Sequence, residues 1–330
     1  MRRRQYTRFL ALILLLPSFA ARIRAADPAA ELASFSIFDG IDLAELAKSD
    51  VKTLHGPPSS GRYLSVQSCY VAPGAPARQL EALRQWNPTQ HRELKVFLHG
   101  DLPSSPTAAN LFAKLDRALA NGPGQALTEA TKKMSRDLQI SEAEAKKFKG
   151  GSVASFWSDL LAARAKLFVS GGSAAQPPYD HTGNAIRPNE ELKALLKQQD
   201  KIRQHFSGFL NGTGIGRGLG GINPELYWEL MDVDDQGVLT LGAFYKRSDS
   251  GQAADVLYYA SGGYYVALTL YQMWPVTVEG KASTLVWRGD MISSAALESL
   301  HGVERLASES VMVKDIARAV TTFRRDSGGR

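Results

Sequence analysis

The sequence has almost no cysteine: Cys69 is the only one among 330 residues. An internal disulfide and a metal site built on several thiolates are therefore excluded. Cys69 lies in the strand-like run RYLSVQSCYV, which predicts a packed thiol rather than a reactive one. With 44% hydrophobic residues and no crosslink, the fold must be held by its core, and the length suits one large domain or two.

The common motifs of catalysis and cofactor binding are also absent. The sequence contains neither His-Glu-x-x-His nor Gly-x-Ser-x-Gly, so a zincin-type metal site and a nucleophile elbow are not expected. Residues 216–221 match the letters of a dinucleotide-binding loop, but a helical pattern precedes them and a strand pattern follows, the reverse of that motif. We interpret this stretch as a Gly-rich hinge. We expect no cofactor and no identifiable catalytic residue, with an active site of scattered residues as an open alternative.

One stretch looks like the start of a calcium loop. Residues 232–237, DVDDQG, place acids at alternate positions. The fifth position of such a loop is Gln236, however, and the twelfth is Ala243, where a bidentate Glu should stand. Strand patterns flank the stretch on both sides, so we predict a tight turn and no metal site.

No apolar run is long enough for a stable membrane anchor. The run FLALILLLPSFA is twelve residues long, whereas a membrane-spanning helix needs about 20. It follows the basic stretch MRRRQYTR and ends in Ser-Phe-Ala, the order of a secretory signal peptide. We predict a signal peptide at residues 1–20, a periplasmic or secreted mature chain, and no transmembrane span after cleavage. The pair Arg3 and Arg4 is compatible with twin-arginine export, and the Sec route is the alternative.

The chain has little net charge once this segment is removed. It carries 39 Lys and Arg against 33 Asp and Glu, a net charge of +6. Four of the arginines lie in residues 1–20, which leaves 35 against 33. No dense basic stripe of the kind that phosphate contacts require is present. We therefore expect no nucleic-acid partner.

The remaining residues divide into segments by their hydrophobic periodicity. Residues 21–60 form an Ala-rich, helical N-terminal lead that ends at the breaker HGPPSSG. The segments that follow are a strand, a helix and a strand in 61–101, a mostly helical stretch in 102–224, and five strands with a final helix in 225–325. The helical stretch includes two long amphipathic helices that we expect to pack antiparallel. The last helix, over 307–325, places Met312, Ile316, Val320 and Phe323 on one face.

This order of elements resembles the START-like helix-grip superfamily. The run DLAELAKSDVKTLHGPPSSGRYLSVQSCYVAPGAPARQLEALRQWNP is similar to the opening of exported members, and ASTLVWRGDM with the final helix is similar to their close. The resemblance implies an α+β fold for residues 61–101 and 225–325. In it, a curved antiparallel sheet of about seven strands grips the long C-terminal helix, and the helical insertion 102–224 lies between strands 2 and 3. The family's space between sheet and helix often holds an apolar ligand. It has no fixed catalytic signature, so no site residue carries over.

Aromatic residues gather in VLYYASGGYYVALTLYQMW, residues 256–274. Neither face of the strand pattern at 264–274 is polar, which predicts that the final helix covers one face and the inserted helices the other. Core packing and cross-strand pairing explain most of the tyrosines, and ligand contact is the alternative because a buried hydroxyl needs a partner. Trp228 and Trp287 alternate with the charged residues Glu229 and Arg288, so both indoles are expected to face inward. The candidate ligand-contacting residues are Trp228, Tyr258, Tyr265, Leu268, Trp287 and Ile316.

The sequence is compatible with three classes of function. We expect an exported protein of the periplasm or envelope that binds or carries a lipid or other apolar small molecule. One alternative is an envelope interaction scaffold that docks a protein partner through the helical insertion. The other is an enzyme that uses the same cavity. A cavity in which Asp, His or Tyr groups with perturbed pKa values converge would favour the enzyme.

Overall fold

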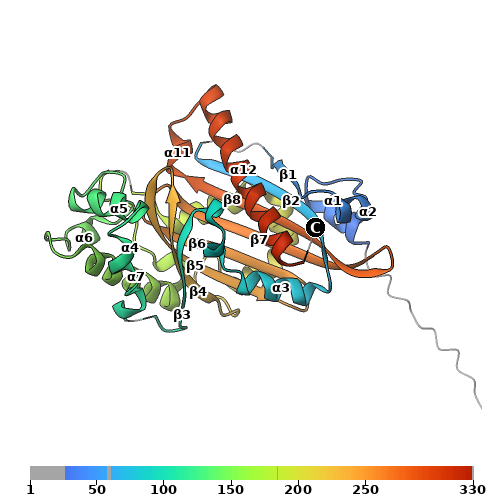
Figure 1. The fold of residues 1–330 in the computed structure, drawn as a ribbon, viewed down its shortest axis with the longest axis horizontal. Helices are drawn as coiled ribbons and strands as arrows, with labels where there is room; N and C mark the ends of the chain where they lie inside the picture. The colour runs from blue at the N-terminus through green and yellow to red at the C-terminus, as the bar shows by residue number, and fades with distance from the viewer. Residues whose placement is uncertain (1–26, 58–60, 107, 184, 329–330) are drawn as a thin grey trace, which may run out of the picture.

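The centre of the fold is one eight-stranded sheet in which every neighbouring pair of strands is antiparallel (Figure 1). The structure is a computed structural model, and it describes residues 27–57, 61–106, 108–183 and 185–328. The predicted signal peptide at residues 1–20 lies outside the described residues. The strand order is β1-β2-β8-β7-β6-β5-β4-β3. The strands are β1 Lys52–His55, β2 Tyr63–Pro73, β3 Val96–Leu102, β4 Glu225–Val233, β5 Gln236–Arg247, β6 Gln252–Ala260, β7 Tyr264–Val278 and β8 Lys281–Ser294.

The sheet has one strand more than the sequence predicted. The additional strand β1 has four residues and pairs with β2 at the edge of the sheet, inside the segment 21–60 that was expected to be helical. Such a short run carries too little alternation to be recognised in an Ala-rich segment. The other seven strands and the long C-terminal helix are confirmed, as is the α+β class with an antiparallel sheet. The turn predicted at residues 232–237 is also confirmed, since Asp234 and Asp235 adopt positive φ values of 52° and 61° between β4 and β5.

Helix α12, Gly302–Asp326, crosses one face of the sheet (Figure 1). Val320 and Phe323 are buried there with Tyr70 and Met273 of the sheet. Ile316 packs at the border of the same apolar cluster. The apolar stripe of the final helix therefore packs on the sheet as the sequence predicted. Helix α3, Pro76–Gln85, packs against the same cluster.

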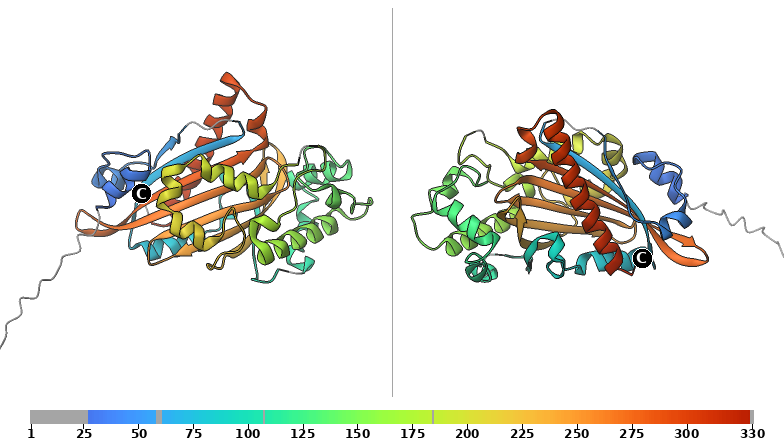
Figure 2. Two further views of the ribbon diagram at one scale, coloured as in Figure 1. Left: turned by 180° about the vertical axis from the view of Figure 1, so that it is seen from behind. Right: turned by 45° about the horizontal axis from the view of Figure 1, so that its top comes forward.

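The inserted helices lie on the opposite face of the sheet and beyond one of its ends (Figure 2). Together with α1 and α2 they enclose the largest apolar core of the molecule. The helices other than α3 and α12 are α1 Pro28–Phe35, α2 Leu43–Lys48, α4 Leu115–Ala118, α5 Pro123–Lys132, α6 Glu142–Ala145, α7 Val153–Gly171, α8 Pro188–Lys197, α9 Asp200–His205, α10 Ser207–Thr213 and α11 Ala295–Glu298. Short 3-10 helices are η1 Pro88–Gln90, η2 Arg92–Leu94, η3 Ala109–Phe112 and η4 Gly172–Ala175. None of the helices in the described part of the chain is long and apolar enough to cross a membrane.

The expected pair of long antiparallel helices is only half correct. Helix α7 is continuous over 19 residues, but the second pattern is divided into α8, α9 and α10. One division falls at Phe206, whose ring is fully buried against Phe35 and Trp287. Tertiary packing of this ring overrides the helical periodicity of the sequence.

The glycines of the expected hinge make close backbone contacts. A Cβ atom on Gly172 would lie 2.3 Å from the carbonyl oxygen of Gly218, and one on Gly220 would lie 2.1 Å from that of Gly212. Glycine is therefore required at Gly172 and Gly220 because backbone segments touch there. Its role as a hinge stays a prediction.

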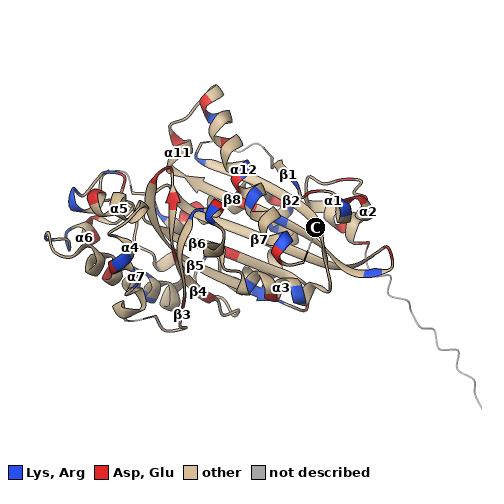
Figure 3. Ribbon diagram, viewed as in Figure 1, with Lys and Arg blue, Asp and Glu red and all other residues tan. Residues whose placement is uncertain are grey.

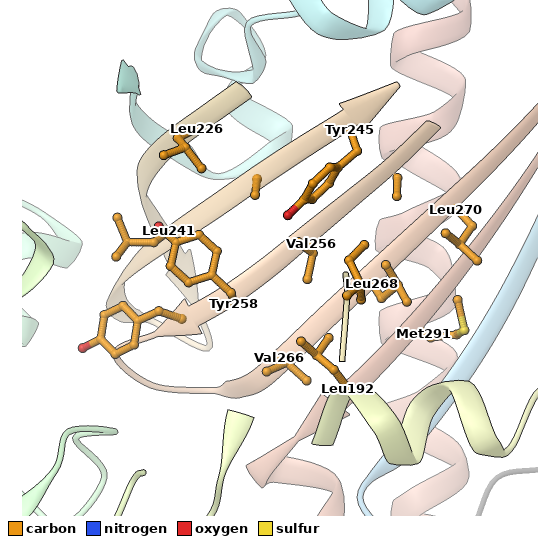
Figure 4. Packing of buried hydrophobic residues seen from close by; sticks show 14 of the residues in the cluster. Leu192, Leu226, Leu241, Tyr245, Val256, Tyr258, Val266, Leu268, Leu270 and Met291 are labelled. Atoms are coloured by element: carbon orange, nitrogen blue, oxygen red, sulfur yellow. The ribbon is translucent and has the colours of Figure 1, made fainter. Parts of the chain in front are cut away.

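Strand β7 is covered on both faces, by the inserted helices on one and on the side of α12 on the other. From residue 266 onward, Val266, Leu268 and Leu270 point into the core on the insertion side, where Figure 4 shows them beside Leu192 of α8. Tyr271 alternates with them and packs on the α12 side. The alternation predicted for this strand is confirmed except at its start. There a bulge between Tyr264 and Val266 changes the faces of the first two tyrosines.

Candidate functional site

A cavity of ≈ 370 Å³ lies between the sheet and the C-terminal half of α12. This volume falls within the range of small-molecule sites, roughly 300–1,000 Å³. Its lining residues come from 83–101, 225–288 and 315–323. The insertion contributes none of the lining residues in the described chain, because it covers the opposite face of the sheet. The cavity is therefore neither filled nor lidded by the insertion.

The walls of the cavity combine apolar and charged side chains. Ala267 lies on the floor and stays half-buried, whereas its neighbours Val266 and Leu268 on the same strand are completely buried. The difference arises because Ala267 faces the open space and its neighbours face the filled core. The apolar and aromatic lining residues include Leu83, Trp86, Leu94, Val96, Leu226, Met231, Phe244, Leu257, Tyr264, Ala319 and Phe323.

The floor carries a tyrosine–aspartate pair. Tyr227 of β4 donates a hydrogen bond from its hydroxyl to Oδ1 of Asp255 on β6 over 2.7 Å. Strand β5 lies between these two strands, and its Gly242 pairs with Tyr227 in the sheet register. A Cβ atom on Gly242 would lie 2.0 Å from Cζ of the Tyr227 ring. The absence of a side chain at Gly242 therefore allows the ring to cross β5 and reach Asp255.

The environment of Asp255 favours its protonated form. Burial raises the pKa of Asp255 to about 7, although the hydrogen bond from Tyr227 favours the carboxylate. The negative charge of nearby Glu229 adds to the increase. Burial also raises the pKa of Tyr227 well above its ordinary value, so this hydroxyl remains a donor at neutral pH. Asp255 is thus a carboxyl group that changes its charge near neutral pH and borders a cavity.

A histidine–glutamate pair lies beside the tyrosine. Nδ1 of His99 on β3 is 2.9 Å from Oε1 of Glu229, and the His99 ring stacks on that of Tyr227 with centroids 5.5 Å apart. Burial disfavours the charged imidazole, but the hydrogen bond and charge of Glu229 outweigh burial and raise the pKa of His99. The pair supports Tyr227 from the side of β3 and neutralises Glu229 when His99 is protonated.

An arginine–aspartate pair closes the other side of the floor. The guanidinium of Arg288 lies 2.7 Å from Oδ1 of Asp290, and the hydroxyl of Thr269 donates to the same oxygen over 2.9 Å. Arg288 also lies 5.6 Å from the ring centroid of Tyr271. Both charges are therefore satisfied within the protein. The described residues contain no group of three or more His, Cys, Asp or Glu that could hold a metal ion.

Most of the residues predicted to contact a ligand lie away from this cavity. Trp228 and Trp287 are buried on the insertion side, Trp228 against Phe112 and Trp287 against Phe35 and Phe206. Both indoles thus face inward as expected, but into the core on the insertion side and not into the cavity. Side chains alternate along a strand, so the indoles face one side and their charged neighbours, Glu229 and Arg288, face the cavity.

The other four candidates also do not come together. Tyr258 stacks on Phe168 at 3.8 Å, and Leu268 is buried in the same core. Tyr265 donates its hydroxyl to Glu298 over 2.9 Å at the surface. Ile316 is on the side of α12 that packs against the sheet, and it does not line the cavity. Five of the six candidates, all except Ile316, lie on the insertion side of the sheet. Ligand contact by these residues stays a prediction.

Sequence reasoning missed the polar floor, although signs of it were present. Asp255 interrupts the apolar strand QAADVLYYA at a position of the α12 face. Tyr227 and Glu229 share one face of β4. Gly242 stands inside the strand VLTLGAFYKR, where glycine often marks a close approach of another group. Only the strand order brings these positions together.

Comparison with known proteins gives a limited result. No family model matches the chain, and no curated protein matches it. Among solved structures, the chain is similar to a START superfamily protein from Mycobacterium smegmatis. The identity is 16% and the TM-score is 0.23, and the match covers 32% of this chain and 67% of that chain.

Proposed function

We propose that this protein binds an amphipathic small molecule in the cavity between the sheet and α12. The observation that carries the proposal is a preformed cavity that is lined by apolar and charged side chains and has a polar floor. Apolar walls favour binding through the surface that they remove from water, and a few placed polar groups fix the orientation of the ligand. The ligand's apolar body would lie along Phe244 and Phe323 and its polar head near Asp255.

The interaction scaffold has less support. The apolar stripe of α7, which includes Trp157 and Leu161, is buried rather than exposed. Among the described residues of the insertion, the exposed large apolar side chains are Leu167 and Leu219. Two isolated side chains do not form a patch of the size that marks a docking surface. A protein partner of the insertion therefore stays a prediction.

A cavity-filling variant tests the binding proposal. Ala267→Trp places an indole in the open space above the floor, so decanol, a neutral amphipathic probe, should no longer bind. Titration calorimetry would measure the loss. Ala282→Trp is the matched control, because Ala282 is exposed on β8 of the same sheet and does not line the cavity. Saturable binding to wild type and the control, but not to the filled variant, supports the proposal. Equal binding to all three proteins, or to none, contradicts it.

A proton-transfer enzyme is a second candidate, favoured by one observation. The carboxyl of Asp255 has its pKa raised to about 7 in a cavity that also holds a tyrosine donor, and a general base is most effective when its pKa is near the operating pH. Hydrogen–deuterium exchange at the α-carbon of a bound alkyl ketone, followed by NMR, would detect such an activity. Exchange by wild type and its loss in Asp255→Asn would support the enzyme, and no exchange above buffer would contradict it.

We also propose that the protein is exported to the periplasm or secreted. The support is the order of basic stretch, apolar run and small-x-small site in residues 1–20. The intact mass of protein purified from its own cells tests this. A mass that lacks about the first 20 residues is expected, and a full-length chain in the cytoplasm would contradict export.

A further inference from the structure

We infer that the cavity selects amphipathic molecules with a positively charged head, such as an alkylammonium group, and that Asp255 pairs with this charge. This assignment rests on the proposed function, since it gives a head-group chemistry to the ligand of the same cavity. It follows from the way in which the charges of the lining are paired.

Every Lys and Arg among the described lining residues already has an acidic partner. Figure 3 shows both signs of charge along α12 and around the floor. The pairs are Arg84 with Glu225 at 3.3 Å, Lys95 with Asp232 at 3.8 Å, Arg288 with Asp290 at 2.7 Å and Arg318 with Asp315 at 2.7 Å. A ligand carboxylate or phosphate would have to compete with a protein acid for each of these cations. The lining therefore disfavours an anionic head.

In contrast to these cations, Asp255 lacks a charged partner among the described residues. Among the described residues it has one hydrogen-bond donor, Tyr227, and no ion pair. The nearest candidates for a counter-ion are engaged elsewhere, His99 with Glu229 and Arg288 with Asp290. Asp255 is half-buried and borders the cavity. It is thus a partly buried acid whose second oxygen is left for a ligand.

The aromatic lining supports the same sign of charge. The rings of Tyr264 and Trp86 border the cavity. The ring of Tyr227, next to Asp255, stacks on that of His99. The faces of aromatic rings attract cations, most strongly where water is excluded. An ammonium head near Asp255 would gain a counter-ion and would lie close to the ring of Tyr227, whereas a carboxylate head would gain no counter-ion.

Three probes with one chain and different heads test the inference: decyltrimethylammonium, decanol and decanoate. The cation should bind about tenfold more tightly than decanol or better, the lower end of the coupling energies measured for close charge pairs, and decanoate should bind most weakly. Asp255→Asn keeps the shape and can still accept from Tyr227, so it should remove the preference for the cation while decanol still binds. Asp249→Asn is the matched control, because it removes the same charge from an exposed turn outside the lining.

The outcomes separate this inference from the proposed function. If decanol binds and the cation has no advantage, or decanoate binds best, the head-group inference is overturned and the proposed function stands. If none of the three probes binds, both fail. An advantage of the cation that persists in Asp255→Asn would also overturn the role of Asp255. Loss of the advantage in Asp255→Asn but not in Asp249→Asn supports it.

Proton release gives an independent readout. Near pH 7 the free carboxyl of Asp255 is about half protonated, and a cation bound beside it lowers its pKa. Binding of decyltrimethylammonium should therefore release up to about half a proton, measured by calorimetry in buffers of different ionisation enthalpy. The charged groups around this carboxyl are Glu229 of β4, His99 of β3 and Arg288 of β8, and they remain in Asp255→Asn. Release that is unchanged in that variant would come from those groups and would overturn the inference.

Discussion

The hydroxyl of Tyr227 reaches across β5 and donates a hydrogen bond to Asp255 over 2.7 Å. Two residues on strands that are not neighbours are joined in this way because Gly242 leaves the space between them free. With His99–Glu229 and Arg288–Asp290, this pair makes part of the sheet face under α12 polar. Asp255 is the acid on which the head-group inference depends.

Substitution at Gly242 should disturb this contact. In Gly242→Ala the added methyl group would collide with the Tyr227 ring, so the protein should lose about 1–3 kcal/mol of stability, as for an overpacked site. The free energy of unfolding from urea denaturation would measure the change. In a Tyr227→Ala background the collision is absent, and the same substitution should stabilise by roughly 0.5–1 kcal/mol because alanine suits a strand better than glycine. An equal loss in both backgrounds would contradict the contact.

The raised pKa of Asp255 predicts a cost to stability at high pH. The folded-state pKa of about 7 lies above the ordinary value of 3.8 for an aspartate, so between these pH values the folded state binds more protons than the unfolded state. The free energy of unfolding therefore falls as the pH rises from about 4 to 7 and Asp255 loses its proton. Asp255→Asn has no such cost. Relative to wild type it should gain a few kcal/mol between pH 4 and pH 8, measured by urea denaturation at both pH values. A difference between the two proteins that does not change with pH would contradict the environment described for Asp255.

Tryptophan emission should identify the ligand's location. Trp86 is the tryptophan among the described lining residues, whereas Trp228 and Trp287 are buried on the other side of the sheet. Decanol should change the emission of wild type and of Trp228→Phe, but not that of Trp86→Phe. The stronger substitution Trp287→Ala should cost about 3–5 kcal/mol of stability through the space that it leaves. An emission change that depends on Trp228 would place the ligand on the insertion side.

Charge substitutions along α12 should show which part of this helix is packed. Val320 is 1% exposed, whereas Val311 on the same helix is 56% exposed. Val320→Asp buries an unpaired charge and should cost several kcal/mol or prevent folding. Val311→Asp should change stability by no more than about 0.5 kcal/mol. Thermal denaturation compares the two, and equal effects would contradict the packing of the C-terminal half of α12 on the sheet.

Local sequence patterns were sufficient for most elements of the fold. Period-two alternation in β7 and the apolar stripe of α12 are properties of contiguous residues, and both appear where the sequence places them. The short strand β1 was missed because four residues in an Ala-rich segment carry little pattern. The helix that ends near Phe206 was predicted too long, since that division depends on Phe35 and Trp287, which are distant in the sequence.

The candidate site could not be predicted from local patterns. Alternation correctly separates Trp228 from Glu229 and Trp287 from Arg288, but it does not say which face of the sheet borders a cavity. That choice depends on where the insertion packs. The pair of Tyr227 and Asp255 depends further on β4, β5 and β6 being successive neighbours in the sheet. Residues 28 positions apart in the sequence are joined only by this order.

A crystal structure of the protein with decyltrimethylammonium would test the central claim most directly. We predict that the probe lies between α12 and the sheet, with its chain along Phe244 and Phe323 and its head beside Asp255. The insertion-side core around Trp287 should be unchanged. A probe bound between the sheet and the inserted helices, or an unoccupied cavity at a saturating probe concentration, would contradict the account.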